Sequence, residues 1–449
     1  MASTAIHRSV TSATTIKKFT LSMWVKRSII TDSTGRRMFT ANGGTGDVYF
    51  RFNADDKIEW SGHGSNASSA GYFITNRLFR DCNAWYHLVI KVDTTQGSSS
   101  DRLKFYVNGV EETSFSSQTL PDQDATDNIV NTSMVHRIGG ISGQYFDGLL
   151  THVHFTQGYA YDASTFGETD STSGIWKPKT APSVTYGTNG FFLKFENSGA
   201  MGTDSSGNSN TFSTTSGTLA QNVDSPTNNY AVLNALSYQN GTKVAAPTNG
   251  NTTLTSNGGS AWGTLLSTMG ASSGKYYCEA KLITVGSYAR LGICDMSVNE
   301  QNSNSSWFVG QTSGSAQYGI NSANGNLYTN AGDSSYANSF TAGDIIGIAM
   351  DLDNSKLYFS KNGTWQNSGV PTSGSTGTGA QSITADKTYG FGFSGYDATV
   401  WNVNFGSGFF GTTAVASANA DDNGHGAFEY DVPAGYYALN TKNIKEFGG

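Results

Sequence analysis

The feature that most restricts the fold of this chain is a series of short runs in which every second residue is apolar. In residues 19–26, FTLSMWVK, this pattern places Leu21, Met23 and Val25 on one side of an extended chain. Residues 84–112 contain two more runs of the same kind. A period of two is typical of half-buried β-strands, because successive side chains of a strand point to opposite faces of its sheet. The pattern therefore predicts strands as the main elements of the fold.

The segments between these runs are rich in Gly, Ser, Thr, Asn and Asp, which favour tight turns. Such a polar composition can also indicate disorder, but the chain contains 25 Phe, 22 Tyr and 8 Trp, too many aromatic residues for a disordered protein. We find no amphipathic pattern that predicts a helix of more than about two turns. We therefore expect an all-β protein of the β-sandwich type, and 449 residues are enough for two jelly-roll-like domains in tandem.

The charge and hydropathy of the chain exclude several classes of function. Only 14% of the residues are charged, the formal net charge is -7 and no basic stripe is present, so nucleic acid is not an expected partner. No apolar run reaches the roughly 18 residues of a membrane-spanning helix, and the N-terminus lacks the apolar segment of a secretory signal. Cys82, Cys278 and Cys294 are far apart and form no CxxC pair, so neither a zinc site nor a disulfide framework is predicted.

Strand-like segments in the first half of the chain carry a family resemblance. Residues 85–87, WYH, begin one segment, and residues 103–110, LKFYVNGV, form another. Together with residues 145–155 they resemble the concanavalin A-like, laminin-G-like jelly rolls, over about residues 15–195. The resemblance implies a lectin-like β-sandwich, and we expect this first domain at residues 1–195.

Residues 342–363, AGDIIGIAMDLDNSKLYFSKNG, form the most specific motif in the chain. They resemble the SPRY domain, in which a G-D pair, an apolar strand, a D-L-D-N turn and an F-S-x-N-G segment follow one another. The resemblance extends over about residues 255–410 and implies a bent β-sandwich that binds ligands and has no catalytic chemistry. We expect this domain at residues 236–410, after a Gly/Ser/Thr/Asn-rich linker at 196–235 that can pack in part, and before a C-terminal tail segment at 411–449.

The order of these segments carries a resemblance of its own. Residues 224–234, DSPTNNYAVLN, precede the SPRY-like region, and residues 433–443, PAGYYALNTKN, follow it. In this order they resemble virion proteins of tailed marine bacteriophages. The resemblance implies a tail fibre, tail appendage or capsid decoration that is assembled in the cytoplasm of the host bacterium. The implied partners are other virion proteins, further copies of the chain in a homo-oligomer, and host cell-surface polysaccharide, although no heptad pattern specifies a number of copies.

The turn motif at residues 351–354, DLDN, can be interpreted in two ways. Asp351, Asp353 and Asn354 offer oxygen atoms of the kind that Ca2+ binds. Asp and Asn side chains also bond to the backbone two residues on and tolerate left-handed conformations, which makes the same residues a hairpin turn. Turn chemistry accounts for the motif without a metal, so we expect a chain reversal here.

A second cluster of oxygen-bearing side chains lies near the C-terminus. Asn419, Asp421 and Asn423 occupy the first, third and fifth places of a calcium-loop pattern, and a glycine follows. The twelfth place is Tyr430, where the pattern needs a bidentate Glu, so the match is weak and a solvated loop is favoured. We therefore expect no cofactor, with Ca2+ at these three residues as the alternative.

Glucanases also use the jelly-roll fold, so catalysis has to be considered. Retaining glycosidases need two carboxylates about 5–5.5 Å apart, which an E-x-D-x-E strand can supply. The sequence has no such motif, its nearest approach being residues 429–431, EYD, and it has no G-x-S-x-G, H-E-x-x-H or P-loop pattern. His152 and His154 can share a strand face but lack a third metal ligand. We predict that the protein is not an enzyme, and a polysaccharide-degrading enzyme with a diverged site is the alternative.

Aromatic residues in turn-rich segments are the remaining candidates for ligand binding. Sugar rings stack on Trp and Tyr faces, and neighbouring Asn or Asp side chains orient the hydroxyl groups. The candidates are Trp60, Tyr72 and Tyr145 in the first half and Trp307, Tyr318, Tyr336 and Tyr396 in the second. For each of them the alternative is packing in the core or at its rim. We predict lectin-like recognition of host-surface glycan or contacts with virion proteins, and an architectural protein that binds no glycan is a further alternative.

Overall fold

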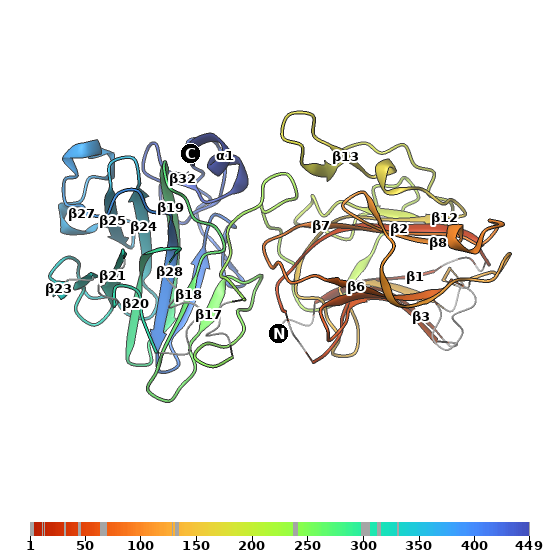
Figure 1. The fold of residues 1–449 in the computed structure, drawn as a ribbon, viewed down its shortest axis with the longest axis horizontal. Helices are drawn as coiled ribbons and strands as arrows, with labels where there is room; N and C mark the ends of the chain where they lie inside the picture. The colour runs from red at the N-terminus through yellow and green to blue at the C-terminus, as the bar shows by residue number, and fades with distance from the viewer. Residues whose placement is uncertain are drawn as a thin grey trace. The chain divides into compact units, whose positions relative to one another are not determined.

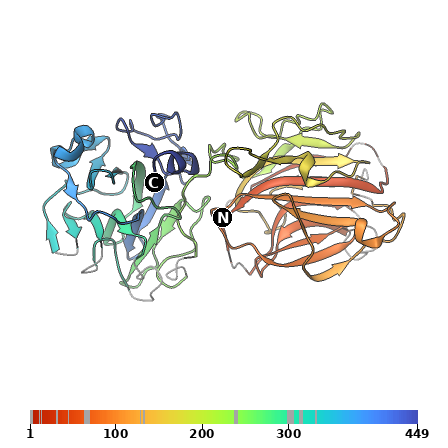
Figure 2. The ribbon, with the colours of Figure 1, turned by 45° about the horizontal axis from the view of Figure 1, so that its top comes forward.

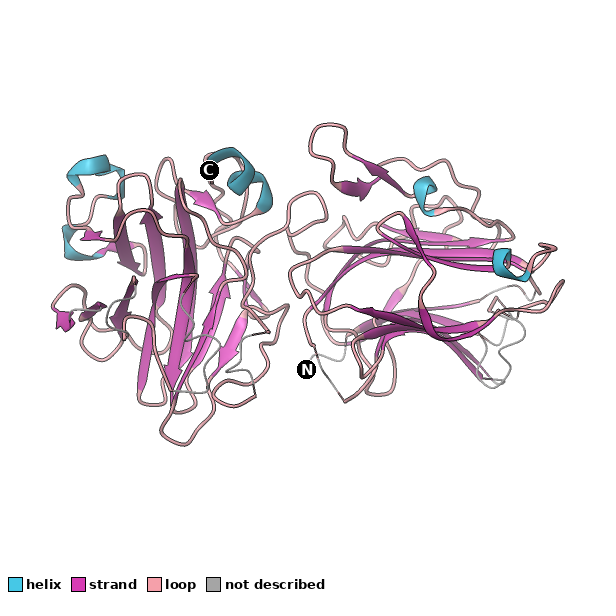
Figure 3. Ribbon diagram, viewed as in Figure 1, coloured by secondary structure: helices cyan, strands magenta, loops and turns pink. Residues whose placement is uncertain are grey.

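The computed structural model describes residues 4–10, 12, 14–30, 33–43, 46–62, 70–127, 129–130, 134–236, 241–297, 306–311, 316–329 and 332–448. The chain divides into two compact units, residues 1–221 and 222–449, which we call the N-terminal unit and the C-terminal unit. In both units the described residues form strands joined by loops (Figure 3), and the α-helix among them is α1, Thr441–Phe447. No described helix is long and apolar enough to cross a membrane. The all-β fold class expected from the sequence is confirmed.

The N-terminal unit is a sandwich of two antiparallel sheets, which appear as layers in Figures 1 and 2. Its strands and 3-10 helices are β1 Ala5–Ser9, β2 Lys18–Arg27, β3 Arg36–Gly43, β4 Gly46–Phe52, β5 Lys57–Ser61, β6 Tyr72–Leu78, β7 Tyr86–Asp93, η1 Ser99–Asp101, β8 Leu103–Val107, β9 Val110–Glu112, β10 Phe115–Thr119, β11 Val135–Ile138, β12 Gly148–Gln157, η2 Ala163–Thr165, β13 Gly167–Thr169, β14 Trp176–Pro178, β15 Phe191–Leu193 and β16 Ser213–Ser216. The eight-stranded sheet has the order β10-β6-β5-β4-β3-β11-β1-β16, and the six-stranded sheet has the order β15-β12-β2-β7-β8-β9.

One hydrophobic core fills the space between these two sheets. On β4 the side chains of Val48, Phe50 and Phe52 are buried in the core, while Tyr49 and Arg51 alternate with them on the outer face. This alternation is the period of two read from the sequence, and it fixes the register because a shift by one residue would expose the Phe rings. Burying each such ring stabilises the fold by roughly 1.5–3 kcal/mol.

A two-stranded hairpin, β13 with β14, covers part of the outer face of the six-stranded sheet (Figure 1). Its Trp176 packs against a small buried cluster of Val89, Tyr106 and Ala163. Val89 and Tyr106 are paired residues of β7 and β8 whose side chains point away from the main core. The hairpin therefore gives this sheet face a second, smaller core.

Residues 196–221, which the sequence assigns to a linker, are part of the N-terminal unit. β16 pairs with β1 and so becomes the edge strand of the eight-stranded sheet. The ring of Phe212 is buried, with its centre 4.8 Å from that of Phe191. Asp204 Oδ1 accepts the backbone N–H of Phe192 at 2.9 Å. The sequence analysis allowed this stretch to pack in part, and one buried ring and one strand pairing hold residues whose composition is otherwise that of a loop.

The C-terminal unit contains two further sheets. Its strands and 3-10 helices are β17 Thr253–Thr255, β18 Trp262–Leu266, β19 Lys275–Thr284, β20 Tyr288–Asp295, β21 Gln317–Asn321, β22 Leu327–Thr329, β23 Gly332–Ser334, β24 Ile345–Asp351, β25 Lys356–Lys361, β26 Thr364–Trp365, η4 Gln366–Ser368, η5 Pro371–Thr376, β27 Gln381–Ser382, β28 Tyr389–Tyr396, β29 Val400–Asn404, β30 Phe409–Phe410, β31 Thr413–Ala414 and β32 Tyr437–Ala438. One sheet has the order β17-β29-β19-β24-β25-β26, with β27 on β25 and β32 on β19, and the other has the order β18-β28-β20-β21-β22-β23.

The D-L-D-N segment forms the turn between β24 and β25, which pair as an antiparallel hairpin. Asp351 Oδ1 accepts the backbone N–H of Asn354 at 3.0 Å, and Asp351 Oδ2 lies 2.9 Å from Lys275 Nζ. Asp353 Oδ1 accepts the backbone N–H of Gly274 at 2.7 Å. Both carboxylates therefore stabilise a chain reversal, as expected. Among the described residues, no group of three or more His, Cys, Asp or Glu side chains could hold a metal ion.

The first and last segments of the C-terminal unit, residues 222–235 and 411–449, also pack onto its sheets. β32 lies parallel to β19, and Tyr230 forms a β-bridge with Asn440. The buried carboxylate of Glu279 on β19 accepts the backbone N–H groups of Glu429 and Tyr430 at 2.8 and 2.9 Å. Residues 222–235 and the tail segment 411–449 are therefore structural parts of this unit.

Candidate functional site

The outer face of the eight-stranded sheet carries a row of polar and aromatic side chains. Tyr49 on β4 is paired with Ser61 on β5, and Ser61 is paired with Tyr72 on β6. Because paired residues of antiparallel strands lie side by side, the three side chains form a line across the sheet. Both tyrosines are half-buried. We use the name tyrosine face for Arg37, Tyr49, Arg51, Glu59 and Tyr72.

Charged groups hold the ring of Tyr49 in place. The guanidinium carbons of Arg37 and Arg51 lie 4.8 and 4.7 Å from the centre of this ring. Arg51 forms an ion pair of 2.9 Å with Glu59, and the hydroxyl of Tyr49 donates a hydrogen bond of 2.9 Å to Glu59 Oε1. Burial and the neighbouring Glu59 raise the pKa of Tyr49, so its hydroxyl is a hydrogen-bond donor at neutral pH. The tyrosine face is therefore an ordered set of rings, donors and acceptors.

This arrangement suits a ligand that is rich in hydroxyl groups. The ring of Tyr72 on β6 supplies apolar surface, and the guanidinium of Arg37 supplies N–H donors further along the face, on β3. Arg37 itself is held by Asp47, at 3.0 Å, and by the side-chain oxygen of Gln144, at 2.6 Å. Specific pockets and grooves combine apolar surface with a few such oriented polar groups.

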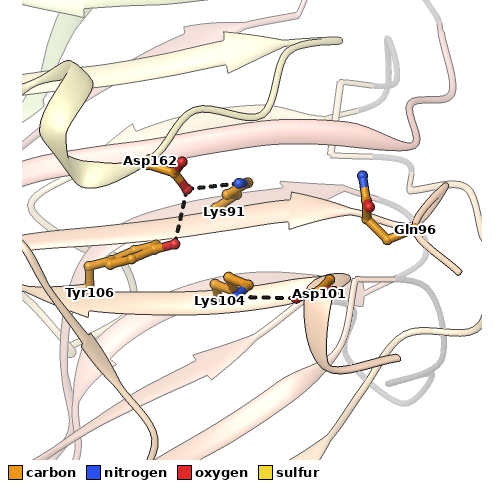
Figure 4. A pocket seen from close by; sticks show the side chains of 6 residues that line it. All are labelled: Lys91, Gln96, Asp101, Lys104, Tyr106 and Asp162. Carbon is orange, nitrogen blue, oxygen red and sulfur yellow. Dashed lines mark hydrogen bonds and ion pairs between the residues drawn. The ribbon is translucent and has the colours of Figure 1, made fainter. Parts of the chain in front are cut away.

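A polar pocket of about 330 Å³ lies over the outer face of the six-stranded sheet (Figure 4). The residues that line it are Lys91, Gln96, Asp101, Lys104, Tyr106 and Asp162. Lys91 Nζ lies 2.7 Å from Asp162 Oδ1, the hydroxyl of Tyr106 donates to the same oxygen at 3.0 Å, and Lys104 Nζ lies 3.2 Å from Asp101 Oδ1. Burial opposes the effect, but the bonds from Lys91 and Tyr106 lower the pKa of Asp162. Both carboxylates of the pocket are therefore paired with lysines, and the lowered pKa of Asp162 does not suit a general acid.

A serine and a histidine form a buried pair beneath the β13–β14 hairpin. Ser22 Oγ lies 2.9 Å from His87 Nε2, and the indole N–H of Trp176 donates to His87 Nδ1 at 3.0 Å. Because Nδ1 accepts this bond, the proton of the neutral imidazole is on Nε2 and is donated to Ser22. Burial lowers the pKa of His87 to about 3. The imidazole therefore cannot take a proton from Ser22, and the pair serves packing.

The two histidines of β12 lie on either side of an irregularity in the strand. The pairing of β12 with β2 shifts register between Thr151 and His154, and His152 has a φ of 48°. Both imidazoles still contact the ring of Phe192, at 5.8 and 3.8 Å between ring centres. His154 is buried and bonds through Nδ1 to the hydroxyl of Tyr186 at 2.9 Å. The described residues supply no third metal ligand here.

The C-terminal unit presents three aromatic side chains in line across β18, β28 and β20, which are neighbouring strands in Figure 1. Trp262 and Tyr288 are each paired with Tyr396. The ring centres are 5.3 Å apart for Trp262 and Tyr396 and 6.0 Å apart for Tyr288 and Tyr396. Tyr288 is 45% exposed, and the other two are half-buried. We use the name aromatic row for these three residues.

Four of the seven aromatic residues predicted to bind a ligand are buried, namely Trp60, Trp307, Tyr318 and Tyr336. Trp60 is fully enclosed in the main core of the N-terminal unit, where its Nε1 donates to the carbonyl of Ala70 at 3.1 Å. The other three fill hydrophobic clusters of the C-terminal unit. A ring without solvent access cannot stack on a sugar, so the ligand-binding interpretation is wrong for these four residues and the packing alternative holds.

The other three predicted aromatic residues are half-buried at the surface. Tyr72 belongs to the tyrosine face and Tyr396 to the aromatic row. Tyr145 forms a β-bridge with Arg37 and so lies at the border of the tyrosine face. The sequence analysis did not predict Tyr49 and Trp262 as site residues, although both side chains are only half-buried. Their prediction would have required the order of the strands in each sheet, which decides which side chains are neighbours.

The weak calcium candidates near the C-terminus form a structural turn. Asp421 is buried, and its Oδ1 accepts the backbone N–H groups of Asn423 and His425 at 3.0 and 2.8 Å. Its Oδ2 accepts the N–H of Ala438 at 2.9 Å. Asn419 turns its side-chain amide to backbone carbonyls. The calcium interpretation is therefore corrected, because the carboxylate is already saturated with N–H donors.

Comparison with known proteins agrees with this architecture. Residues 3–160 match the model of the concanavalin A-like lectin/glucanases superfamily, and residues 275–405 match the model of the SPRY domain. The chain therefore carries a concanavalin A-like domain followed by a SPRY domain, two kinds of domain that fit a carbohydrate- or protein-binding role. A search of the curated proteins finds no match.

Two solved structures are among those to which the chain is similar. The SPRY domain of human HERC1 is 21% identical, covering 34% of this chain and 87% of that chain with a TM-score of 0.27. The TRIM65 PSpry domain is 10% identical, covering 39% of this chain and 88% of that chain with a TM-score of 0.30.

Proposed function

We propose that the protein is a non-catalytic recognition protein whose N-terminal unit binds glycan on the tyrosine face. The observation that carries the proposal is the line of Tyr49, Ser61 and Tyr72 across three paired strands, with Arg37 and Arg51 on either side of Tyr49. A pyranose ring can stack on the exposed part of Tyr72 while hydroxyl groups of the same glycan bond to the guanidinium groups of the tyrosine face.

The arrangement of acids and nucleophiles supports binding without bond cleavage. Glycoside hydrolysis needs one carboxyl group with a raised pKa and a second one beside it. In the pocket of Figure 4 the pKa of Asp162 is lowered by Lys91 and Tyr106, and Asp101 is paired with Lys104. A polysaccharide-degrading enzyme remains the alternative that the experiment below addresses.

We also propose that the protein acts on the surface of a tailed-phage virion, as a fibre, appendage or capsid decoration present in several copies. The resemblance of the segment order to phage virion proteins supports this placement, and so do two consecutive domains of binding type. Other virion proteins and host-surface polysaccharide would be the partners. Mass spectrometry of purified particles tests the placement: peptides of this chain should co-purify with infectious particles, and their absence would overturn the virion part of the proposal alone.

The glycan part is tested with the purified full chain on a glycan array and on host cells. Tyr72→Ala should weaken binding about tenfold, because the stacked ring is lost. Tyr159→Ala is the matched control, since Tyr159 is 43% exposed in the same unit but follows β12 of the other sheet. Binding that is equal in the two variants would refute the tyrosine face as the site.

A reducing-sugar assay on the same glycans separates binding from catalysis. No release of reducing ends is expected over hours of incubation. Sustained turnover that depends on Asp162 would show that the enzyme alternative is correct. Binding to virion proteins without binding to any glycan would favour the architectural alternative.

A further inference from the structure

The aromatic row of the C-terminal unit borders a buried arginine. Arg290 lies two residues beyond Tyr288 on β20, so its side chain points to the same face of the sheet. Its guanidinium carbon lies 4.8 Å from the ring centre of Trp262 in the aromatic row. Two further rings complete its surroundings, with the centre of Phe308 at 3.5 Å and that of Tyr328 at 3.7 Å. The cation is therefore enclosed by aromatic faces.

Two nitrogen atoms of the Arg290 guanidinium have no hydrogen-bond partner among the described residues. Only 6% of the residue is exposed, and its Nε and Nη1 atoms are buried without a hydrogen-bond partner. The nearest acidic influence is Asp333 on β23, whose carboxylate accepts a bond from the Asn326 amide at 2.8 Å. Burial lowers the pKa of Arg290 to about 10, so the side chain is still charged at neutral pH. Contacts with ring faces stabilise a cation, but they satisfy no N–H donor.

The chemistry of a guanidinium indicates which ligand group would bind to Arg290. Its planar fork of N–H donors matches the two oxygens of a carboxylate, which it binds through a pair of parallel hydrogen bonds. A ligand carboxylate would therefore supply both the charge and the acceptors that the surroundings of Arg290 lack. Trp262 lies beside this position, so the rest of the ligand would contact the aromatic row.

The surface of the row favours a sugar over a peptide. Extended peptides usually add to the free edge of a sheet, where backbone groups are unpaired. Trp262 lies on the edge strand β18, but Tyr288 and Tyr396 lie on β20 and β28, which are interior strands with neighbours on both sides, so most of the row is on the face of the sheet. The adjoining rings of the aromatic row form an apolar surface on which a pyranose can stack.

We propose that the aromatic row and Arg290 form a second binding site, specific for an acidic sugar whose ring stacks on Trp262 and Tyr288 and whose carboxylate bonds to Arg290. The site is separate from the tyrosine face and does not depend on it. Phe308 and Tyr328 cover the guanidinium, so one of these rings has to turn aside when the carboxylate enters. Both rings are half-buried, and such rotations require no change in strand pairing.

The test measures binding of the full chain to oligogalacturonate and to its methyl ester, in which a methyl group on each carboxylate removes the charge. Oligogalacturonate should bind at least tenfold more tightly than the ester. Arg290→Gln should remove this preference, and Trp262→Ala should weaken both ligands. Sialyllactose against lactose repeats the comparison with a second acidic sugar.

Further variants distinguish this site from a purely structural cluster. Phe308→Ala uncovers Arg290, so it should maintain or increase the affinity for oligogalacturonate even if the melting temperature falls. If the rings and Arg290 only stabilise the unit, the variants should have altered melting temperatures, and the parent chain should bind the acid and the ester equally. Tyr72→Ala, in the other unit, should leave the preference unchanged whether or not the tyrosine face binds glycan.

Three results would overturn the proposal. One is equal affinity for the acidic and neutral forms of both sugars, and another is an acid preference that persists in Arg290→Gln. The third is tighter, Arg290-dependent binding of poly-glutamate than of either acidic sugar, which would identify an acidic polypeptide as the ligand.

Discussion

The two units share one architecture, but burial shifts the pKa of a different kind of side chain in each of them. The N-terminal unit encloses three imidazoles, those of His87, His136 and His154, whereas the C-terminal unit encloses the carboxylate of Glu279. Burial lowers the pKa of each imidazole and raises the pKa of Glu279 to about 7. The sandwich fold itself therefore sets no pH response. The response depends on the side chains placed within the fold, and the buried imidazoles and Glu279 should contribute to stability with opposite pH dependence.

Acidification of the N-terminal unit is expected to give the largest effect. The pKa of His87 is about 3 and that of His136 about 4 in the folded unit, compared with 6.5 for an ordinary imidazole. Between these values the unfolded chain binds more protons, so stability is intact above pH 6.5 and is lost as the pH falls. Two pH units below that value, the loss should be roughly 3 kcal/mol for each imidazole. Pulse proteolysis in urea, with fragments assigned to each unit by mass spectrometry, measures it.

His136→Phe tests the cause of this acid sensitivity. The imidazole of His136 packs against the rings of Phe39, Phe155 and Phe191, so a phenyl group keeps the packing and removes one titration. The variant should lose less stability than the parent between about pH 7 and about pH 4.5. An identical acid profile would show that His136 does not contribute.

The C-terminal unit is expected to show the opposite pH dependence. The pKa of Glu279 is about 7 in the folded unit, compared with 4.5 for an ordinary glutamate, so the folded unit binds more protons between these values. Stability is therefore highest at the acidic end of this range and falls as the pH rises through 7, by up to about 3 kcal/mol. The same proteolysis experiment reports on fragments from residues 222–449.

Glu279→Gln is the matched variant for this unit. Glutamine has no charge to desolvate, but its single acceptor oxygen can serve only one of the N–H groups of Glu429 and Tyr430, which bond to different oxygens of Glu279, so the variant loses stability at every pH. The stability of the C-terminal unit should become nearly independent of pH between about 5 and about 8. A slope as steep as that of the parent chain would contradict the assignment to Glu279.

A smaller effect comes from single buried hydrogen bonds in the two units. Trp176→Phe removes the N–H that His87 Nδ1 accepts at 3.0 Å and leaves a buried acceptor unsatisfied, which costs about 1–3 kcal/mol. Tyr336→Phe removes a donor from the carbonyl of Gly379, but this carbonyl also accepts from Asn367 at 3.3 Å. Tyr336→Phe should therefore lower the free energy of unfolding by about 1 kcal/mol or less. Urea denaturation at neutral pH measures both, and an equal loss in the two variants would contradict this ranking.

Much of the fold could be read from local patterns, because strands and turns depend on neighbouring residues. The strand at residues 19–26 and the turn at 351–354 both appear in the structure, although both faces of that strand are buried and not one of them alone. The packing of residues 196–235 could not be read in this way. Their composition is that of a loop, and the rings of Phe212 and Tyr230 find partners that are distant in the sequence.

The candidate sites show the same limit. The parity of alternation could have assigned Trp60 to the core, since it follows Ile58 by two residues and Ile58 is buried. The aromatic row could not be predicted, because Trp262, Tyr288 and Tyr396 become neighbours only through the order β18-β28-β20. Arg290 gave no signal in the sequence, since its enclosure by Phe308 and Tyr328 depends on tertiary packing.

The smallest expected effect is a difference in salt dependence between the two proposed binding faces. A neutral glycan on the tyrosine face exchanges hydrogen bonds with water, so raising the salt from about 0.05 to about 0.5 M should leave its affinity nearly unchanged. A carboxylate on Arg290 forms a charge pair, which salt weakens, although burial of Arg290 limits screening to about two- to fivefold. Calorimetric titrations with the neutral glycan and with oligogalacturonate, each at several salt concentrations, measure how steeply the two affinities depend on salt. Equal slopes would mean that charge does not distinguish the faces, and a steep slope lost in Arg290→Gln would assign the difference to this one side chain.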